Sequence, residues 1–185
     1  MKKIKLYIRF IWIALILSGL MLFFLYPDSF TKESISLFVQ RNSSHILLVY
    51  FLLSLLRGIF LLPSTPFVLA GIILFPNQPT LVFLVSLLGI TITAFYLYYA
   101  SKFLELGVLF SNKQLSKSEN IRKKLHKHGF LIVLIWSFFP IVPTDLISYI
   151  AGSIKMNFTK YITGIVLGES ILIGLYIYFG IQIAQ

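Results

Sequence analysis

Three charged residues stand alone inside apolar stretches of this chain, and they are its first candidates for chemistry. Arg57, Asp145 and Glu169 each lie within segments rich in Leu, Ile, Val and Phe. A charge at the centre of a bilayer costs about 2.5–3.5 kcal/mol on insertion scales, so such residues usually face a bundle interior and mark an ion or substrate path. The alternative is structural: Arg57 and Asp145 pin the fold as a pair, and Glu169 snorkels or caps its neighbours.

Hydroxyl groups lie beside two proline pairs that interrupt these apolar stretches. Where a helix is broken, its free backbone N–H groups favour anions. The neighbouring hydroxyls either help to bind an anionic head group or only satisfy the freed backbone. Both acids are also candidates for proton exchange. The hydroxyl candidates are Ser64, Thr65, Thr144 and Ser148.

No motif of a standard soluble enzyme is present, so we predict that the chain is not an enzyme. It lacks a P-loop, Gly-x-Ser-x-Gly, His-Glu-x-x-His and Gly-x-Gly-x-x-Gly. The absence of cysteine excludes disulfides and thiolate metal sites, and His126 with His128 is only a weak metal signal. We therefore expect no cofactor and no metal.

The composition places these residues in a membrane protein. Hydrophobic residues make up 58% and charged residues 12% of the 185 residues, and the mean hydropathy is +0.90. Soluble domains carry about 25% charged residues. The net charge of +10 is better explained by loops that face an anionic leaflet than by nucleic acid, which we do not expect as a partner.

Hydropathy and proline placement predict the elements that position the candidate residues. Segments 7–26, 80–100 and 161–180 are long enough to cross a ~30 Å hydrocarbon core as helices. Two other apolar stretches are broken by Pro63 with Pro66 and by Pro140 with Pro143. Their outgoing arms, 67–75 and 145–154, are too short to cross, and proline breaks a helix. The predicted fold is an all-α integral membrane protein with three full transmembrane helices and two proline-tipped re-entrant hairpins.

The distribution of basic residues predicts the orientation. Segments 1–9, 101–129 and 155–160 hold 4, 7 and 2 Lys or Arg residues, which is 13 of the 16 in the chain. The positive-inside rule then puts the N-terminus in the cytoplasm and the C-terminus outside. This requires the first hairpin to enter from outside and the second from inside. If their tips meet near the midplane, Arg57 and Asp145 come close together.

The two halves carry the same series of motifs. Pro-x-x-Pro, Ala-Gly, Leu-Gly and Tyr-x-Tyr occur twice in this order, with Gly71 and Gly152 in the Ala-Gly pairs. Because the hairpins enter from opposite sides, we interpret this as an inverted repeat, which in transporters points to a central site. The predicted organisation is an anchor helix with an external loop (1–45) and a membrane domain (46–180). That domain comprises the repeats 46–100 and 130–180 and a basic linker 101–129.

These motifs resemble a known family. The stretch Phe139-Pro140-Ile-Val-Pro143-Thr-Asp145-Leu-Ile-Ser-Tyr149-Ile-Ala151-Gly152 is similar to the DedA-like superfamily, also called the VTT or SNARE-associated Golgi protein family, and is closest to its Tvp/TMEM branch. The stretch Arg57-Gly-Ile-Phe-Leu-Leu-Pro63-Ser-Thr-Pro66 is also similar to that branch, and His128-Gly129-Phe130 fits it. The resemblance covers about 46–180.

The resemblance implies two inverted re-entrant hairpins and a role in moving lipids between leaflets. Bacterial members are linked to undecaprenyl phosphate recycling with proposed proton coupling, and eukaryotic relatives to phospholipid scrambling. Two positions depart from the family pattern. Ser137 stands where an arginine is frequent, and Ser64 and Thr65 replace an acidic residue of the core DedA branch. These departures weaken the expectation of head-group binding from the second hairpin and of proton-coupled export.

The leading functional hypothesis is therefore a flippase or scramblase of the plasma membrane for a polyprenyl phosphate or phospholipid. In it, a midplane cavity passes an anionic head group. Arg57 attracts the phosphate, and Asp145 orients Arg57 or exchanges protons. The alternatives are a proton- or ion-coupled transporter of a small solute and a scaffold that does not transport. A homo-oligomer is compatible with each hypothesis.

Overall fold

The computed structural model describes residues 2–42, 45–104, 128–139 and 143–184, and every regular element within these ranges is a helix. This confirms the predicted all-α class. The bounds, in chain order, are α1 Lys2–Leu25, η1 Pro27–Phe30, α2 Lys32–Asn42, α3 Ile46–Leu56, η2 Arg57–Phe60, α4 Thr65–Leu74, α5 Pro79–Leu104, an unlabelled helix His128–Phe138, α7 Thr144–Ser153 and α8 Phe158–Ala184.

Three of these helices are long and apolar enough to cross a membrane, as predicted. The candidate spans are Lys5–Leu25 in α1, Pro79–Leu104 in α5 and Phe158–Gly180 in α8, with 21, 26 and 23 residues. A rise of 1.5 Å per residue carries each of them across a core of about 30 Å. Many large apolar side chains on their surfaces are exposed, including Phe24 at 77%, which suits a surrounding of lipid.

The first hairpin turns back after a tightened helical turn. Helix α3 continues into the 3-10 helix η2, and Leu61 then takes a left-handed conformation with φ of 55°. The N–H of Leu62 donates to the carbonyl of Arg57, which closes the turn. Helix α4 then begins with Pro66 in its first turn, where a missing N–H costs nothing. Proline and a left-handed residue together reverse the chain.

The second hairpin consists of the helix His128–Phe138 and helix α7. Pro143 directly precedes α7, while Pro140 and the two residues after it lie outside the described residues. Helix α7 ends where Lys155 takes a φ of 56°, and the N–H of Met156 donates to the carbonyl of Ala151. Such a left-handed residue satisfies carbonyls that the helix end leaves free.

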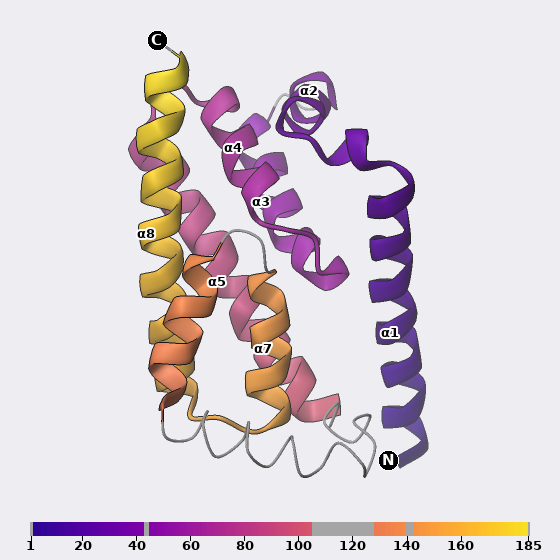
Figure 1. Ribbon diagram of the computed structural model, residues 1–185. Coiled ribbons are helices and arrows are strands. Elements are labelled where there is room, and N and C mark those ends of the chain that lie inside the picture. Colours follow the sequence, from indigo (N-terminus) through magenta and orange to yellow (C-terminus); the bar gives the residue numbers. More distant parts are fainter. Residues whose placement is uncertain (1, 43–44, 105–127, 140–142, 185) are drawn as a thin grey trace.

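The two hairpins enter the bundle from opposite ends (Figure 1). Helices α3 and α4 occupy the upper half of this view, and the helix His128–Phe138 and α7 occupy the lower half. Helix α5 runs downward and α8 upward beside them, so the first repeat is inverted relative to the second. Helix α1 begins at the end opposite to the one where α8 ends.

The segment predicted as an external loop contains a helix. Helix α2 packs on α4, and its buried Ile35 belongs to one apolar cluster with Phe67 and Ala70 of α4. The apolar positions of this helix are few and its polar ones many, so hydropathy alone did not identify it. The basic linker is described only at its two ends, 101–104 and 128–129, and six of its seven Lys or Arg residues lie outside the described residues.

Close helix contacts bring the halves together at α5, which packs against both α7 and α8. A Cβ atom on Gly152 would lie 2.2 Å from the carbonyl oxygen of Tyr98, so only glycine allows α7 to approach α5 this closely. Tyr98 and Tyr161 stack with ring centroids 5.1 Å apart in the same buried cluster. The close approach of Gly152 to Tyr98 positions the second hairpin against α5, and the stacked tyrosines hold α8 beside α5.

Candidate functional site

An ion pair joins the two hairpins. Arg57 Nη1 donates to Asp145 Oδ2 at 2.9 Å and to the carbonyl oxygen of Leu62 at 3.0 Å. Arg57 begins η2, next to the turn of the first hairpin, and Asp145 lies in the first turn of α7. The two residues are 88 positions apart in the sequence and only 3% and 2% exposed. The structure therefore contains the proximity that the sequence led us to expect.

The polar contact continues from the second hairpin to the last helix. The hydroxyl of Thr144 donates to Glu169 Oε1, and Glu169 is 1% exposed in α8. Thr144 precedes Asp145 in α7, so Arg57, Asp145, Thr144 and Glu169 form a connected row. We call these four residues the polar row. It links elements from both repeats through the buried interior.

Two polar atoms of this row have no hydrogen-bond partner among the described residues. They are Arg57 Nη2 and Glu169 Oε2, and both are buried. Leaving a buried polar group unpaired costs about 1–3 kcal/mol, and more for a charged group. Such groups are normally satisfied by water, an ion or a ligand. Arg57 Nη2 is a donor suited to an anionic oxygen such as that of a phosphate.

The hydroxyls at the first hairpin's turn make a separate contact. Thr65 Oγ1 lies 3.1 Å from Tyr176 Oη, which connects the start of α4 to α8. The carbonyl of Ser64 accepts the N–H groups of Phe67 and Val68. Ser64 and Thr65 are half-buried. They lie where the N-terminus of α4, with its free backbone donors, points toward the middle of the molecule.

The hydroxyl of Ser148 bonds to the backbone of its own helix. Its Oγ donates to the carbonyl of Thr144 at 3.2 Å, one helical turn earlier. Ser137, which occupies the position of the family arginine, donates to the carbonyl of Val133 at 2.8 Å and is fully buried. A Cβ on Gly168 would lie 2.8 Å from the Ser137 Cβ. The helix His128–Phe138 thus approaches α8 too closely for a long side chain at position 137.

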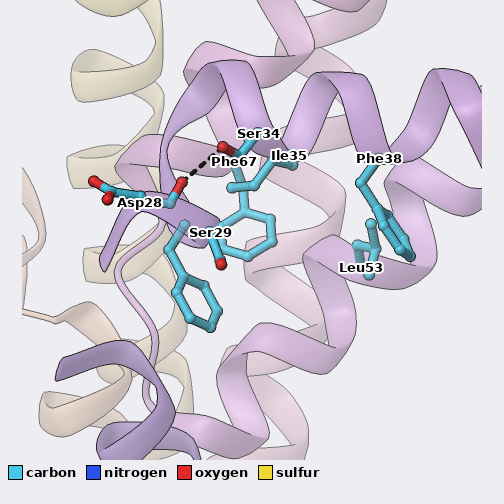
Figure 2. Close-up of a pocket in the computed structure, with 8 residues that line it drawn as sticks. Asp28, Ser29, Ser34, Ile35, Phe38, Leu53 and Phe67 are labelled. Atoms are coloured by element: carbon cyan, nitrogen blue, oxygen red, sulfur yellow. Dashed lines mark hydrogen bonds between the residues drawn. The ribbon is translucent and has the colours of Figure 1, made fainter. Parts of the chain in front are cut away.

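The polar row is closed to solvent in this conformation. The described grooves have linings that do not include Arg57 or Asp145, and the one in Figure 2, of about 440 Å³, lies between η1, α2 and the first hairpin. Leu53 and Phe67 line it from the hairpin side. Among the described residues, the open midplane cavity that the functional hypothesis requires is not formed around the charges, because Arg57 and Asp145 contact each other directly and are buried.

Sequence reasoning missed two tyrosines with partners in the hairpins. Tyr176 belongs to the second Tyr-x-Tyr motif and contacts Thr65. Tyr149, one turn after Asp145, accepts a hydrogen bond of 2.6 Å from Trp12 Nε1 in α1. The repetition of Tyr-x-Tyr was the only signal for Tyr176, and no periodicity links Trp12 with Tyr149.

Comparisons with known proteins agree with this architecture. The family model of the VTT domain matches residues 62–182. An uncharacterised protein of the archaeon Methanocaldococcus jannaschii is 34% identical over 146 residues, which is 69% of this chain and 88% of that protein. No solved structure matches the chain. With two inverted hairpins and a family match over most of its length, the chain belongs to the VTT-domain family of multi-pass membrane proteins.

Proposed function

We propose that this protein moves a lipid with an anionic head group, a polyprenyl phosphate or a phospholipid, between the leaflets of a plasma membrane. The observation that carries the proposal is Arg57 Nη2, which has no hydrogen-bond partner among the described residues although Arg57 lies where the two hairpins are joined by an ion pair. An anionic oxygen there would satisfy a buried cation. It would also lie halfway along the path between the leaflets.

The surrounding residues support this assignment through their donors. Helices α4 and α7 both begin beside the hairpin turns, and helix N-termini favour negative charge. Arg57 attracts the phosphate, and Asp145 holds the guanidinium in place or exchanges a proton with the path. Ser64, Thr65 and Thr144 supply hydroxyl donors. In the closed state Glu169 accepts a hydrogen bond from Thr144, and in an open state the Thr144 hydroxyl donates to the substrate instead.

Transport by this site requires an alternation between closed and open arrangements. The described conformation is the closed one, because the charges of the polar row are at most 3% exposed. Relative movement of inverted repeats around a fixed site is the usual route to alternating access. The acyl or isoprenyl tails remain in the bilayer, to which the exposed apolar side chains of the long helices are suited. The basic segments 1–9, 101–129 and 155–160 are assigned to the cytoplasmic side.

The test is lipid exchange in liposomes. Purified protein is reconstituted with fluorescent phospholipids and polyprenyl phosphates, and a membrane-impermeant quencher then reports how much of the label has changed leaflet. The expected result is complete quenching with the wild type and half quenching in empty liposomes. Arg57→Gln is expected to lose exchange, whereas Arg41→Gln, at an exposed position of α2, keeps it.

Quenching that stays at half for every lipid tested would refute lipid transfer. If proton or solute flux then appears in the same liposomes, the site serves a small-solute transporter instead. Exchange that persists unchanged in Arg57→Gln would leave lipid transfer standing but would remove the polar row from its mechanism.

A further inference from the structure

Helix α1 is attached to the bundle far more loosely than the other spans. Only 6% of its most apolar stretch is buried in the protein, against 39% for α5 and 33% for α8. Elements with few buried contacts are those that open at the lowest free-energy cost. The VTT match begins at residue 62, so α1 also lies outside the matched domain.

The contacts that α1 does make follow one narrow stripe. Trp12, Ile16, Gly19 and Phe23, at alternating steps of four and three residues, all contact the bundle or pack against its buried clusters. Lys5, seven residues before Trp12, lies over the ring of Phe103 at 4.8 Å. This spacing places all of them on one face of a helix. We call this line of contacts the α1 seam.

The α1 seam crosses the place where the two hairpins meet. Trp12 Nε1 donates to Tyr149 Oη at 2.6 Å, and Tyr149 lies one turn after Asp145 on the same face of α7. Farther along, a Cβ on Gly19 would lie 2.4 Å from the Cβ of Phe60. Phe60 belongs to η2, the segment that Arg57 begins. One helix therefore touches the second hairpin beside Asp145 and the first hairpin beside Arg57.

Unfilled space lies where the seam ends. After α1 the chain continues into η1, whose residues Asp28, Ser29 and Phe30 line the groove of about 440 Å³ shown in Figure 2. Its opposite wall includes Leu53 of α3, which lies one turn before Arg57. Both polar and apolar side chains line the groove, among them Asp28, Ser34 and Phe38, and its volume is within the range of about 300–1,000 Å³ for ligand sites. An amphiphile has room there without displacing α5 or α8.

We propose that α1 is a lateral gate, and that a lipid phosphate reaches Arg57 from the bilayer by separating the α1 seam from the hairpin turns. The inference rests on the proposed lipid transfer and names the route to its site. Separation breaks the Trp12–Tyr149 hydrogen bond and the Gly19–Phe60 contact. The more deeply buried helices α5 and α8 stay in place.

The chain contains no cysteine, so a reversible cross-link can test the gate. The variant Gly19→Cys with Phe60→Cys places two thiols across the seam. A disulfide needs Cβ atoms about 3.5–4.5 Å apart, which a small outward shift of α1 supplies. The control is Phe95→Cys with Phe158→Cys, whose native rings are 5.8 Å apart. That bond joins α5 to α8, which stay in place in the proposed opening, and it involves no residue of the α1 seam or of the groove.

In liposomes, the oxidised seam variant is expected to exchange lipid at least tenfold more slowly than the reduced one. The control pair is expected to exchange equally in both states, with cross-linking verified on a gel. Equal exchange in the fully cross-linked seam variant would overturn the gate while lipid transfer by the wild type still stands. No exchange by the wild type would overturn lipid transfer and the gate together.

A second variant covers the case in which the reduced seam pair is inactive. Trp12→Phe keeps an aromatic ring but removes the N–H that donates to Tyr149. A gate that opens more readily should exchange lipid at least twofold faster than the wild type. Exchange that is unchanged or slower in this variant would contradict the gate independently of the cross-link.

Discussion

The two hairpins enter the bundle from opposite ends (Figure 1) and supply opposite charges. The first hairpin turns through a 3-10 segment and a left-handed Leu61, and it supplies the cation Arg57. The second hairpin leads directly from Pro143 into α7 and supplies Asp145 and Thr144 from the first helical turn. The two hairpins therefore share an inverted arrangement but not the same turn, and the charges that meet between them are complementary.

This difference explains how a pseudo-symmetric scaffold can hold an ion pair in a membrane. Two identical charges at the meeting point would repel each other, whereas one cation and one anion hold the hairpins together. Among the described residues, Arg57 Nη2 and Glu169 Oε2 have no hydrogen-bond partner. These two atoms are the candidate substrate contacts.

The largest expected effect comes from removing one half of the ion pair. Arg57→Met leaves Asp145 buried without its partner and is expected to lower the free energy of unfolding by about 3–5 kcal/mol. Adding Asp145→Leu should restore stability nearly to that of the wild type, because an apolar pair of similar volume fits the same space. Denaturant unfolding in detergent micelles measures both. A single variant as stable as the wild type would show that the hairpins are not held by these charges.

A second comparison uses the paired Ala-Gly motifs of the hairpins. Gly152→Ala places a methyl group against the backbone oxygen of Tyr98, and Gly71→Ala places one against the side-chain hydroxyl of Tyr50. Overpacking costs about 1–3 kcal/mol, and the rigid backbone should make Gly152→Ala the more costly of the two. Gly174→Ala, with no atom within 4 Å of the added Cβ, is the control. A lower melting temperature for Gly71→Ala than for Gly152→Ala would contradict the closer packing of the second hairpin.

The smallest effects separate the two threonines that connect the hairpins to α8. Thr144→Val removes the donor to Glu169 and leaves a buried carboxyl without it, a loss of about 1–3 kcal/mol. Thr65→Val loses a half-buried contact with Tyr176, and about 0.5–1.5 kcal/mol is expected. Unfolding of both variants in the same detergent gives the comparison. Equal losses would mean that Glu169 finds another donor.

The spans and hairpins could be predicted because hydropathy and proline act locally. Lengths of apolar sequence gave the three long helices, and each proline pair coincides with a reversal. The approach of Arg57 to Asp145 followed from the cost of leaving lone charges in a bilayer. The roles of Arg57, Asp145, Ser64, Thr65, Thr144 and Glu169 in transport stay predictions.

The remaining features depend on tertiary contacts that no local pattern encodes. Helix α2 forms because its few apolar residues, among them Ile35, find α4. The left-handed Leu61 carries no glycine signal, since the turn imposes the conformation on an ordinary residue. The Trp12–Tyr149 bond joins positions 137 residues apart. Closure of the polar row likewise depends on contacts between distant parts of the chain, which join Arg57 to Asp145 and Thr144 to Glu169.

Lipid exchange by the apolar double variant tests the central claim most directly. Arg57→Met with Asp145→Leu should remain folded, so a loss of activity would report chemistry and not collapse of the fold. We predict that liposomes containing this variant quench like empty ones while wild-type liposomes quench completely. Wild-type exchange by the folded double variant would contradict a role for these two charges in moving the head group.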